Sequence, residues 1–356
     1  MLRIQNAFKY FVSAAILLFV AQAGYADTRV KEVQHKLVEM GYNPGIVDGV
    51  WGKKTEAALN LFLATKGQTF DGAIDGNEFE ILGISNTQDD WLTFNYNIHD
   101  SLPPKWISEF EFIIGILRTT LPIEKSIDQL IQDSTFNIYA WNGKIKDPFG
   151  RNMAGACICG NGQDRWMVLE IPEDEFKYQS LHRYSVIIHE YFHIYQIGLS
   201  NDNMQPKWLV EGGAKVIEEM VTQQYYGDNS LQNDLGRRDL WSDEVFTDPR
   251  IFETHSMSSG ESANGAYIDM NYAGSAFMLL ALVNELQKEG KSEKEALRSV
   301  FRDFWIANRS ANWKAAFVET FEMSVEDFYE KLSSYSRRDY RKILPSGSLM
   351  FQDIFK

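Results

Sequence analysis

Hydrophobic residues between positions 28 and 84 recur in short helical patterns that glycine-rich turns separate. One predicted helix ends at Gly41, and a second begins at Thr55 and ends at Gly67. Their inner faces carry the apolar residues Val30, Val33, Leu37, Met40, Ala58, Leu59 and Phe62. Further turns precede Phe79 and Leu82. The pattern predicts a compact, mostly helical module over residues 27–84.

The remaining pattern predicts a larger domain over residues 106–356. Residues 85–105 lack periodicity and contain Pro103-Pro104, so we interpret them as a linker. An apolar helix should follow at 107–117. Strands are predicted at 136–141, 154–159 and 165–171, the last two joined by a turn at Gly160, Asn161 and Gly162. From residue 182 onward the pattern is mostly helical. Strands first and helices afterwards indicate an α+β fold rather than βαβ units.

The first 26 residues have the order of a secretory signal peptide. Arg3 and Lys9 form a positive start, residues 10–20 are apolar, and small residues lead to a predicted cleavage after Ala26. The alternative is an uncleaved membrane anchor, but the apolar run is short for a span of about 20 residues. We therefore expect an exported protein, periplasmic or extracellular, without a stable membrane span after cleavage.

Composition narrows the possible partners and the chemistry. A length of 356 residues allows about two domains, and the formal net charge is −14. No basic run offsets this charge, which argues against a nucleic-acid partner. The two cysteines, Cys157 and Cys159, are too few for a metal site. We expect them to be small strand residues, with an unusual i, i+2 disulfide as the alternative.

The N-terminal pattern resembles the small three-helix peptidoglycan-binding domain of bacterial wall enzymes. The residues that carry the resemblance are Val33, Gln34, Leu37, Gly41, Tyr42, Asp48, Gly49, Trp51, Gly52, Thr55, Ala58, Phe62, Asp71 and Gly72. The resemblance implies the fold and suggests peptidoglycan as a partner. A purely structural role for the module is the alternative.

The main chemical signal is His189-Glu190-Tyr191-Phe192-His193, within a nearly all-apolar helical segment. Residues four apart project from one helix face, so His189 and His193 can offer two imidazole nitrogens to one ion. Glu190 stands beside that pair. It can reach a water molecule at the ion without ligating the ion, which suits a general base.

A third ligand is expected, because two imidazoles do not complete a catalytic zinc site. Glu211 follows His193 after seventeen intervening residues, enough for a loop and a returning helix. The alternative is a solvated carboxylate at a helix start, favoured by the helix dipole. Apolar residues before Glu211 and two glycines after it fit a solvated face poorly. We therefore predict that Glu211 is the third ligand.

The pair of motifs, with Trp208, Gly212 and Ala214 around Glu211, looks like the gluzincin group of metallopeptidases, which includes thermolysin and aminopeptidase N. This resemblance implies a thermolysin- or aminopeptidase-like domain. It also implies Zn²⁺ held by His189, His193 and Glu211, with Glu190 as the base that activates water.

Two further residues have predicted roles in this domain. Glu218, on the same helix face as Glu211, could accept a hydrogen bond from the second imidazole N–H of a ligand; an exposed carboxylate is the alternative. Tyr272 resembles the tyrosine that stabilises the oxyanion in aminopeptidase-type members, with a core tyrosine as the alternative. Tyr267 and His255 are lesser candidates. The stretch 155–161 departs from aminopeptidases, since it has no glutamate for a free amine, and this favours an endopeptidase.

The sequence thus predicts an exported zinc peptide-bond hydrolase that acts on a peptide or protein near the cell wall. Two other interpretations stay open. The chain could be a catalytically inactive, peptidase-like protein that binds peptidoglycan, or the zinc could be purely structural. Intact His189, Glu190, His193 and Glu211 argue against the first. The second leaves Glu190 without a role, and structural zinc sites are usually closed by Cys and His.

Overall fold

The computed structural model describes residues 28–72, 74, 76–84, 92–124, 127, 130–131, 133–161, 164–237, 240–254 and 270–355. The predicted signal peptide and the lesser candidates Tyr267 and His255 lie outside these residues. Together the described elements form a mixed α+β structure, as the sequence predicted, with many helices and one four-stranded sheet.

The N-terminal module consists of three helices: α1 (Thr28–Glu39), α2 (Lys53–Thr65) and α3 (Gly76–Ile81). The loop between α1 and α2 is organised by the buried Gln34. Its Oε1 accepts hydrogen bonds from the backbone N–H groups of Asp48 and Gly49, and its Nε2 donates to Thr55 Oγ1. The polar residues of this motif therefore hydrogen-bond to one another and hold the loop.

The sheet has the order β1-β2-β4-β3. Its strands are β1 (Thr93–Ile98), β2 (Thr135–Asn142), β3 (Ala156–Asn161) and β4 (Asp164–Ile171). The predicted hairpin is confirmed, because β3 and β4 pair antiparallel. Two other expectations were wrong. The segment 85–105, interpreted as a linker, contains β1 and the first residues of α4. In addition, β1 and β2 are parallel and flank that helix, so the fold does include one βαβ unit.

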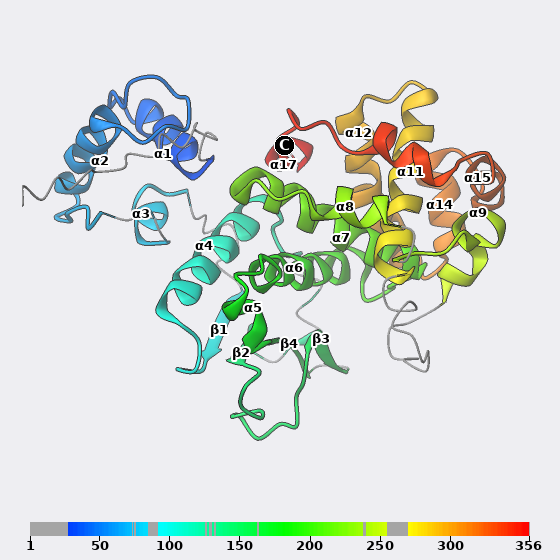
Figure 1. Cartoon of the computed structure of the whole chain (residues 1–356), viewed down its shortest axis with the longest axis horizontal. Coiled ribbons are helices and arrows are strands. Elements are labelled where there is room, and N and C mark those ends of the chain that lie inside the picture. Colours follow the sequence, from blue (N-terminus) through cyan, green and yellow to red (C-terminus); the bar gives the residue numbers. More distant parts are fainter. Residues whose placement is uncertain are drawn as a thin grey trace, which may run out of the picture.

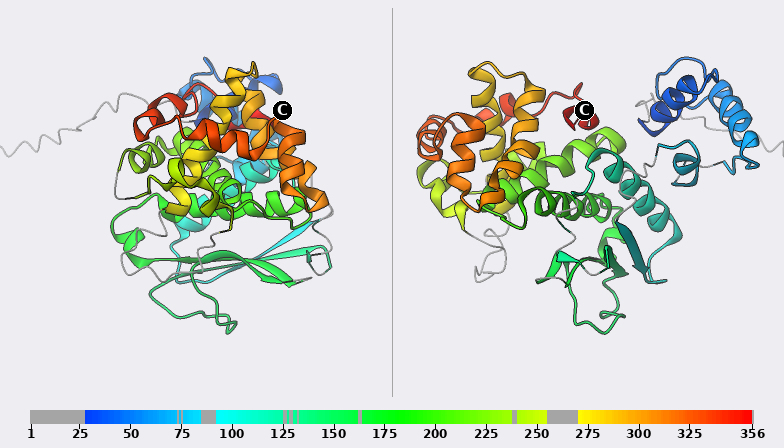
Figure 2. Two further views of the ribbon diagram at one scale, coloured as in Figure 1. Left: turned by 90° about the vertical axis from the view of Figure 1, so that its right-hand side faces the viewer. Right: turned by 180° about the vertical axis from the view of Figure 1, so that it is seen from behind.

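Helix α4 (Pro104–Thr120) begins at the Pro103-Pro104 pair, where proline suits the first turn. After the short α5 (Glu173–Lys177) come the two long helices α6 (His182–Ser200) and α7 (Lys207–Tyr226). In Figure 1 the sheet lies below α6, and α7 crosses on the other side of α6; Figure 2 shows the same layers from two further sides. Helix α6 is therefore covered on both sides, which explains why nearly all of it is buried.

The C-terminal helices pack at the far end of α7 (Figure 1). The elements between α7 and this region are α8 (Ser230–Gly236), α9 (Glu244–Thr247), η2 (Pro249–Glu253) and η3 (Met270–Gly274). The remainder comprises α11 (Ser275–Lys288), α12 (Glu293–Arg298), η4 (Ser299–Asp303), α13 (Phe304–Ala307), η5 (Asn308–Ser310), α14 (Trp313–Phe321), α15 (Val325–Leu332), η6 (Arg337–Asp339), α16 (Tyr340–Ile343) and α17 (Phe351–Phe355). The capping box that starts α12 at Ser292 is present, as predicted.

The module packs directly against the larger domain. Arg29 of α1 forms an ion pair with Glu109 of α4 at 3.1 Å, and Glu109 also accepts a hydrogen bond from Tyr226 of α7. The rings of Phe79 and Phe112 meet edge to face across the same boundary. Consequently the apolar core of the module continues into that of the domain.

Cys157 and Cys159 form a disulfide on β3. The preferred expectation of two unbridged strand residues was therefore wrong, and the alternative holds. Both side chains pack with Trp141, Met153 and Val168, which form a small second core separate from the one around α6. Two sulfurs at i and i+2 share one strand face, so the bridge lies within that face.

Within the described residues, no helix combines the length and the apolar character that a membrane crossing requires.

Candidate metal centre

Helix α6 brings the two histidines of the motif together on one face. The ring centroids of His189 and His193 lie 4.8 Å apart, with the rings nearly perpendicular. His189 is almost fully buried between the sheet and α7. A buried imidazole needs polar partners, and both rings have them on each side.

Glu211 reaches the pair because α7 folds back across α6. The loop between the helices is fixed by the buried Asn308, whose Nδ2 donates hydrogen bonds to the carbonyl oxygens of Asn203 and Gln205 at 2.7 and 3.1 Å. The loop ends at Pro206, which precedes the first turn of α7. This fixed return places Glu211, in the second turn, opposite the histidines.

Three ligand atoms converge on one point. Glu211 Oε2 lies 3.4 Å from His189 Nε2 and 3.4 Å from His193 Nε2. All three atoms lie within 4.8 Å of one another. A tetrahedral zinc site with bonds of about 2.1 Å separates its ligand atoms by about 3.4 Å. The donor types and their separations therefore fit a zinc ion with three protein ligands.

The outer nitrogen of His189 is held by Glu218, as the sequence suggested. His189 Nδ1 lies 3.2 Å from Glu218 Oε2. The carboxylate of Glu218 is fixed in turn by Ser185, whose hydroxyl donates to Oε1 at 2.7 Å, and by Lys215, whose Nζ lies 3.1 Å from the same atom. Glu218 is 5% exposed, so the alternative of a solvated carboxylate was wrong. This arrangement turns Nε2 of His189 toward the common point.

The outer nitrogen of His193 has a partner that the sequence analysis missed. His193 Nδ1 lies 2.8 Å from Gln196 Oε1, and Gln196 Nε2 donates to the carbonyl oxygen of Val210 on α7. Gln196 is fully buried. Its position three residues after His193, on the same helix face, was the available signal.

Burial and charge shift the ionisation of the cluster. Burial alone would lower the pKa of His189, but the carboxylates of Glu211 and Glu218 outweigh it and raise the pKa to about 10. Burial opposes ionisation of Glu211 as well, yet the neighbouring histidines hold its pKa well below the ordinary value. The pKa of Glu218 falls in the same way, mainly through Lys215. Both carboxylates are therefore favoured in their charged form beside the two imidazoles.

Glu190 differs from the two carboxylates above. It is 6% exposed, and burial raises its pKa. Its carboxylate has no hydrogen-bond partner within the described part of the chain. A buried carboxylate with a raised pKa and no fixed partner is suited to accepting a proton near neutral pH.

Tyr272, in η3, lies beside the cluster. Its ring centroid is 5.4 Å from that of His189, and the two rings meet edge to face. The close approach of α7 to the start of α11 makes this possible. A Cβ on Gly212 would lie 2.4 Å from the carbonyl oxygen of Ser275, so only glycine allows this contact. The structure thus brings together all six residues that the sequence selected.

Comparison with known families supports one of the two predicted domains. Residues 26–82 match the model of the putative peptidoglycan binding domain. A peptidoglycan-binding domain is therefore present, in agreement with the predicted module at 27–84. Neither the curated proteins nor the solved structures yielded a match to the chain.

Proposed function

We propose that the protein is a zinc-dependent peptide-bond hydrolase of the gluzincin type that acts at the bacterial cell wall. The observation that carries the proposal is the convergence of His189 Nε2, His193 Nε2 and Glu211 Oε2, with the carboxylate oxygen 3.4 Å from each nitrogen and all three atoms within 4.8 Å of one another. In this proposal, residues 106–356 form the thermolysin- or aminopeptidase-like catalytic domain.

Zinc, when bound, supplies a Lewis acid that polarises the scissile carbonyl and makes water more acidic. The residues of the chain perform the proton transfers. Glu190 accepts the proton of the attacking water and can return it to the leaving amine. Its burial raises the pKa of the carboxyl group, which favours acceptance of the proton. Glu218 and Gln196 keep the two imidazoles oriented toward the ion.

Tyr272 is proposed to stabilise the transition state. Its position against His189 places it at the edge of the cluster, where negative charge develops on the carbonyl oxygen. A tyrosine hydroxyl can donate a hydrogen bond to that oxygen.

The substrate is proposed to be a peptide or protein of the envelope, cut internally. The peptidoglycan-binding domain supports a location at the wall, because it would concentrate the enzyme there. Residues 155–161 contain no carboxylate to hold a free α-amine, which supports an endopeptidase. Export through the signal peptide is part of this proposal.

The test uses the mature chain from Asp27, incubated with a mixed library of peptides and proteins. Cut sites are mapped by mass spectrometry, and bound metal is measured by plasma emission. A Glu190→Gln variant and a chelator-treated sample serve as controls. We expect internal cuts that disappear in both controls, with zinc retained in Glu190→Gln.

Other outcomes separate the alternatives. Zinc bound without any cut, in the library and in isolated peptidoglycan, would favour an inactive wall-binding protein. Absence of both zinc and cuts would refute the proposal. Cuts restricted to the first residue of each peptide would leave the hydrolase in place but replace the endopeptidase with an aminopeptidase.

A further inference from the structure

A second cavity lies where the N-terminal module meets the larger domain. Its volume is about 880 Å³, within the range of pockets that bind small ligands. Helix α1 forms one wall, α6 and η4 form others, and the C-terminal helix α17 closes one side. Figure 1 shows α17 between the module and the domain. The cavity therefore exists only when the module is docked.

One buried polar group faces this cavity without a protein partner. Tyr195 of α6 lines the cavity and is 3% exposed, yet its hydroxyl makes no hydrogen bond within the described residues. Its ring is fixed edge to face against Phe355. A buried donor without a partner usually indicates a bound ligand or water.

The cationic side chains around Tyr195 come from both parts of the protein. Arg298 and Arg302 of the larger domain line the cavity, and Arg302 also forms an ion pair with Asp303 at 3.3 Å. Lys31, His35 and Lys36 of α1 contribute from the module. These residues make the cavity a local basic region in a chain of formal net charge −14.

The described part of the chain contributes three carboxylates to the cavity, and two of them have partners in the protein. Glu32 accepts hydrogen bonds from Tyr225 and Gln352 at the module boundary. Glu124 pairs with Arg309 at 3.6 Å. Asp353 is the third. Among the described residues, four lysines and arginines with one histidine line the cavity beside three carboxylates, and this excess of cationic groups favours an anionic ligand.

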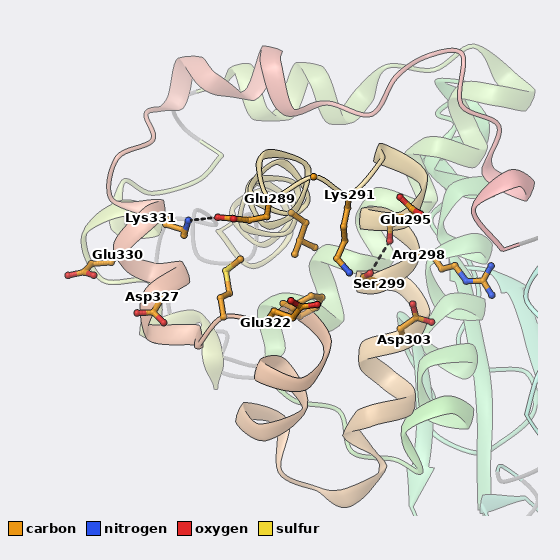
Figure 3. A pocket seen from close by; sticks show the side chains of 14 residues that line it. Glu289, Lys291, Glu295, Arg298, Ser299, Asp303, Glu322, Asp327, Glu330 and Lys331 are labelled. Atoms are coloured by element: carbon orange, nitrogen blue, oxygen red, sulfur yellow. Dashed lines mark hydrogen bonds and ion pairs between the residues drawn. The ribbon is translucent and has the colours of Figure 1, made fainter.

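A larger pocket, of about 1210 Å³, lies among the C-terminal helices and shows the contrast (Figure 3). Several of its charged groups are paired within the protein. Lys331 bridges to Glu289 at 3.2 Å, Glu295 caps α12 through Ser292, and Asp327 caps α15 through Ser324. That pocket offers no buried, unpartnered group.

We propose that the cavity at the module boundary binds a carboxylate of the peptidoglycan stem peptide. The Tyr195 hydroxyl would donate to the carboxylate, and Arg302 and Arg298 would supply charge-assisted contacts. The family of the N-terminal module points to peptidoglycan as the polymer, and the buried donor with its arginines points to a carboxylate group. The site depends on the docked module and is independent of the zinc cluster.

The experiment measures binding by titration calorimetry with the mature Glu190→Gln chain, so that hydrolysis cannot interfere. The probes are a synthetic stem tripeptide of peptidoglycan with a free terminal carboxylate, its terminal amide, and trialanine. We expect the free acid to bind, and the amide and trialanine to bind at least about tenfold more weakly.

Two variants test the residues. Tyr195→Phe keeps the ring packing and removes only the hydroxyl, and Arg302→Gln removes one charge. Each should weaken binding of the free acid by about tenfold. Tyr178→Phe and Arg338→Gln make the same chemical changes on exposed surface and should leave binding unchanged. Circular dichroism and thermal unfolding verify that all variants fold.

Several results of these binding measurements would overturn the proposal. Binding that is equal for acid and amide, or equal for the stem peptide and trialanine, would overturn the assignment of the ligand. Unchanged binding in both Tyr195→Phe and Arg302→Gln would show that the ligand binds at another site. Absence of binding by the parent chain would refute the proposal. Because every sample carries Glu190→Gln, failure here leaves the proposed hydrolase untouched.

Discussion

The N-terminal module and the α6–α7 region each carry a motif visible in the sequence, but their polar groups are used in opposite ways. In the module, Gln34 hydrogen-bonds to Asp48, Gly49 and Thr55, so the motif is satisfied internally and builds a loop. In α6 and α7, the outer atoms of the histidines are satisfied by Glu218 and Gln196, while their Nε2 atoms converge with Glu211 on a common point.

This difference separates motifs that indicate a fold from motifs that indicate a binding site. A motif whose polar atoms all pair with one another specifies a fold, and it says little about the ligand. A motif whose buried donor atoms converge on one point indicates chemistry, because it brings together groups that can bind the same ion. The following predictions test this distinction.

The largest effect is expected for His193→Ala. Loss of one zinc ligand should lower zinc affinity by more than the roughly 10–100-fold that accompanies loss of an outer partner. Competition with a chromophoric chelator measures the affinity. His182→Ala, an exposed histidine on the same helix, is the matched control and should bind zinc as the parent does. Equal affinity in His193→Ala and the parent would contradict the proposed ligand set.

Tyr272→Phe should lower kcat by about 10²–10³-fold while zinc content and KM stay near the parent values. The reason is that the hydroxyl contributes only when negative charge develops on the carbonyl oxygen. Steady-state kinetics on a cleaved library peptide provide the measurement. A change in KM alone would assign Tyr272 to substrate binding instead.

The two outer partners should differ in strength. Glu218→Gln is expected to reduce zinc affinity by about 10–100-fold, since it removes a buried charge that orients His189. Gln196→Ala should have a smaller effect, below about tenfold, because a neutral amide polarises an imidazole less. Glu219→Gln is the matched control, as this neighbouring carboxylate is bonded to Ser230 rather than to a ligand. Equal losses in all three variants would indicate a general effect on the packing of α6 against α7.

The smallest effect is predicted for Gln34→Ala in the module. It should lower the free energy of unfolding by about 1–2 kcal/mol, because water can replace part of the lost hydrogen bonding in a surface loop. Zinc affinity should not change. Thermal unfolding and chelator competition test the two statements together. Val38→Ala, at an exposed position on the same helix, should leave stability nearly unchanged.

Much of the candidate site was predictable because its spacing is local. A helical period places His189 and His193 on one face, whatever surrounds the helix, and it does the same for Glu211 and Glu218. The capping box at Ser292 and the hairpin of β3 and β4 are local in the same sense. The module was predictable because its turns and its inward-facing residues all lie within one short stretch.

Long-range packing decided the rest. Phe94, Tyr96 and Ile98 alternate as a strand should, but the polar residues between them resemble a linker until β1 pairs with β2, which is distant in sequence. Gln196 and the role of Gly212 depend on how closely neighbouring helices approach.

The sequence by itself determined the motifs, the α+β class and the three ligand candidates. Only the tertiary structure decided that Glu211 Oε2 lies 3.4 Å from both Nε2 atoms, that β1 joins the sheet, and that a basic cavity forms beside the docked module. The physical reason is that helix periodicity acts over a few residues, whereas these contacts depend on which buried surfaces pack together.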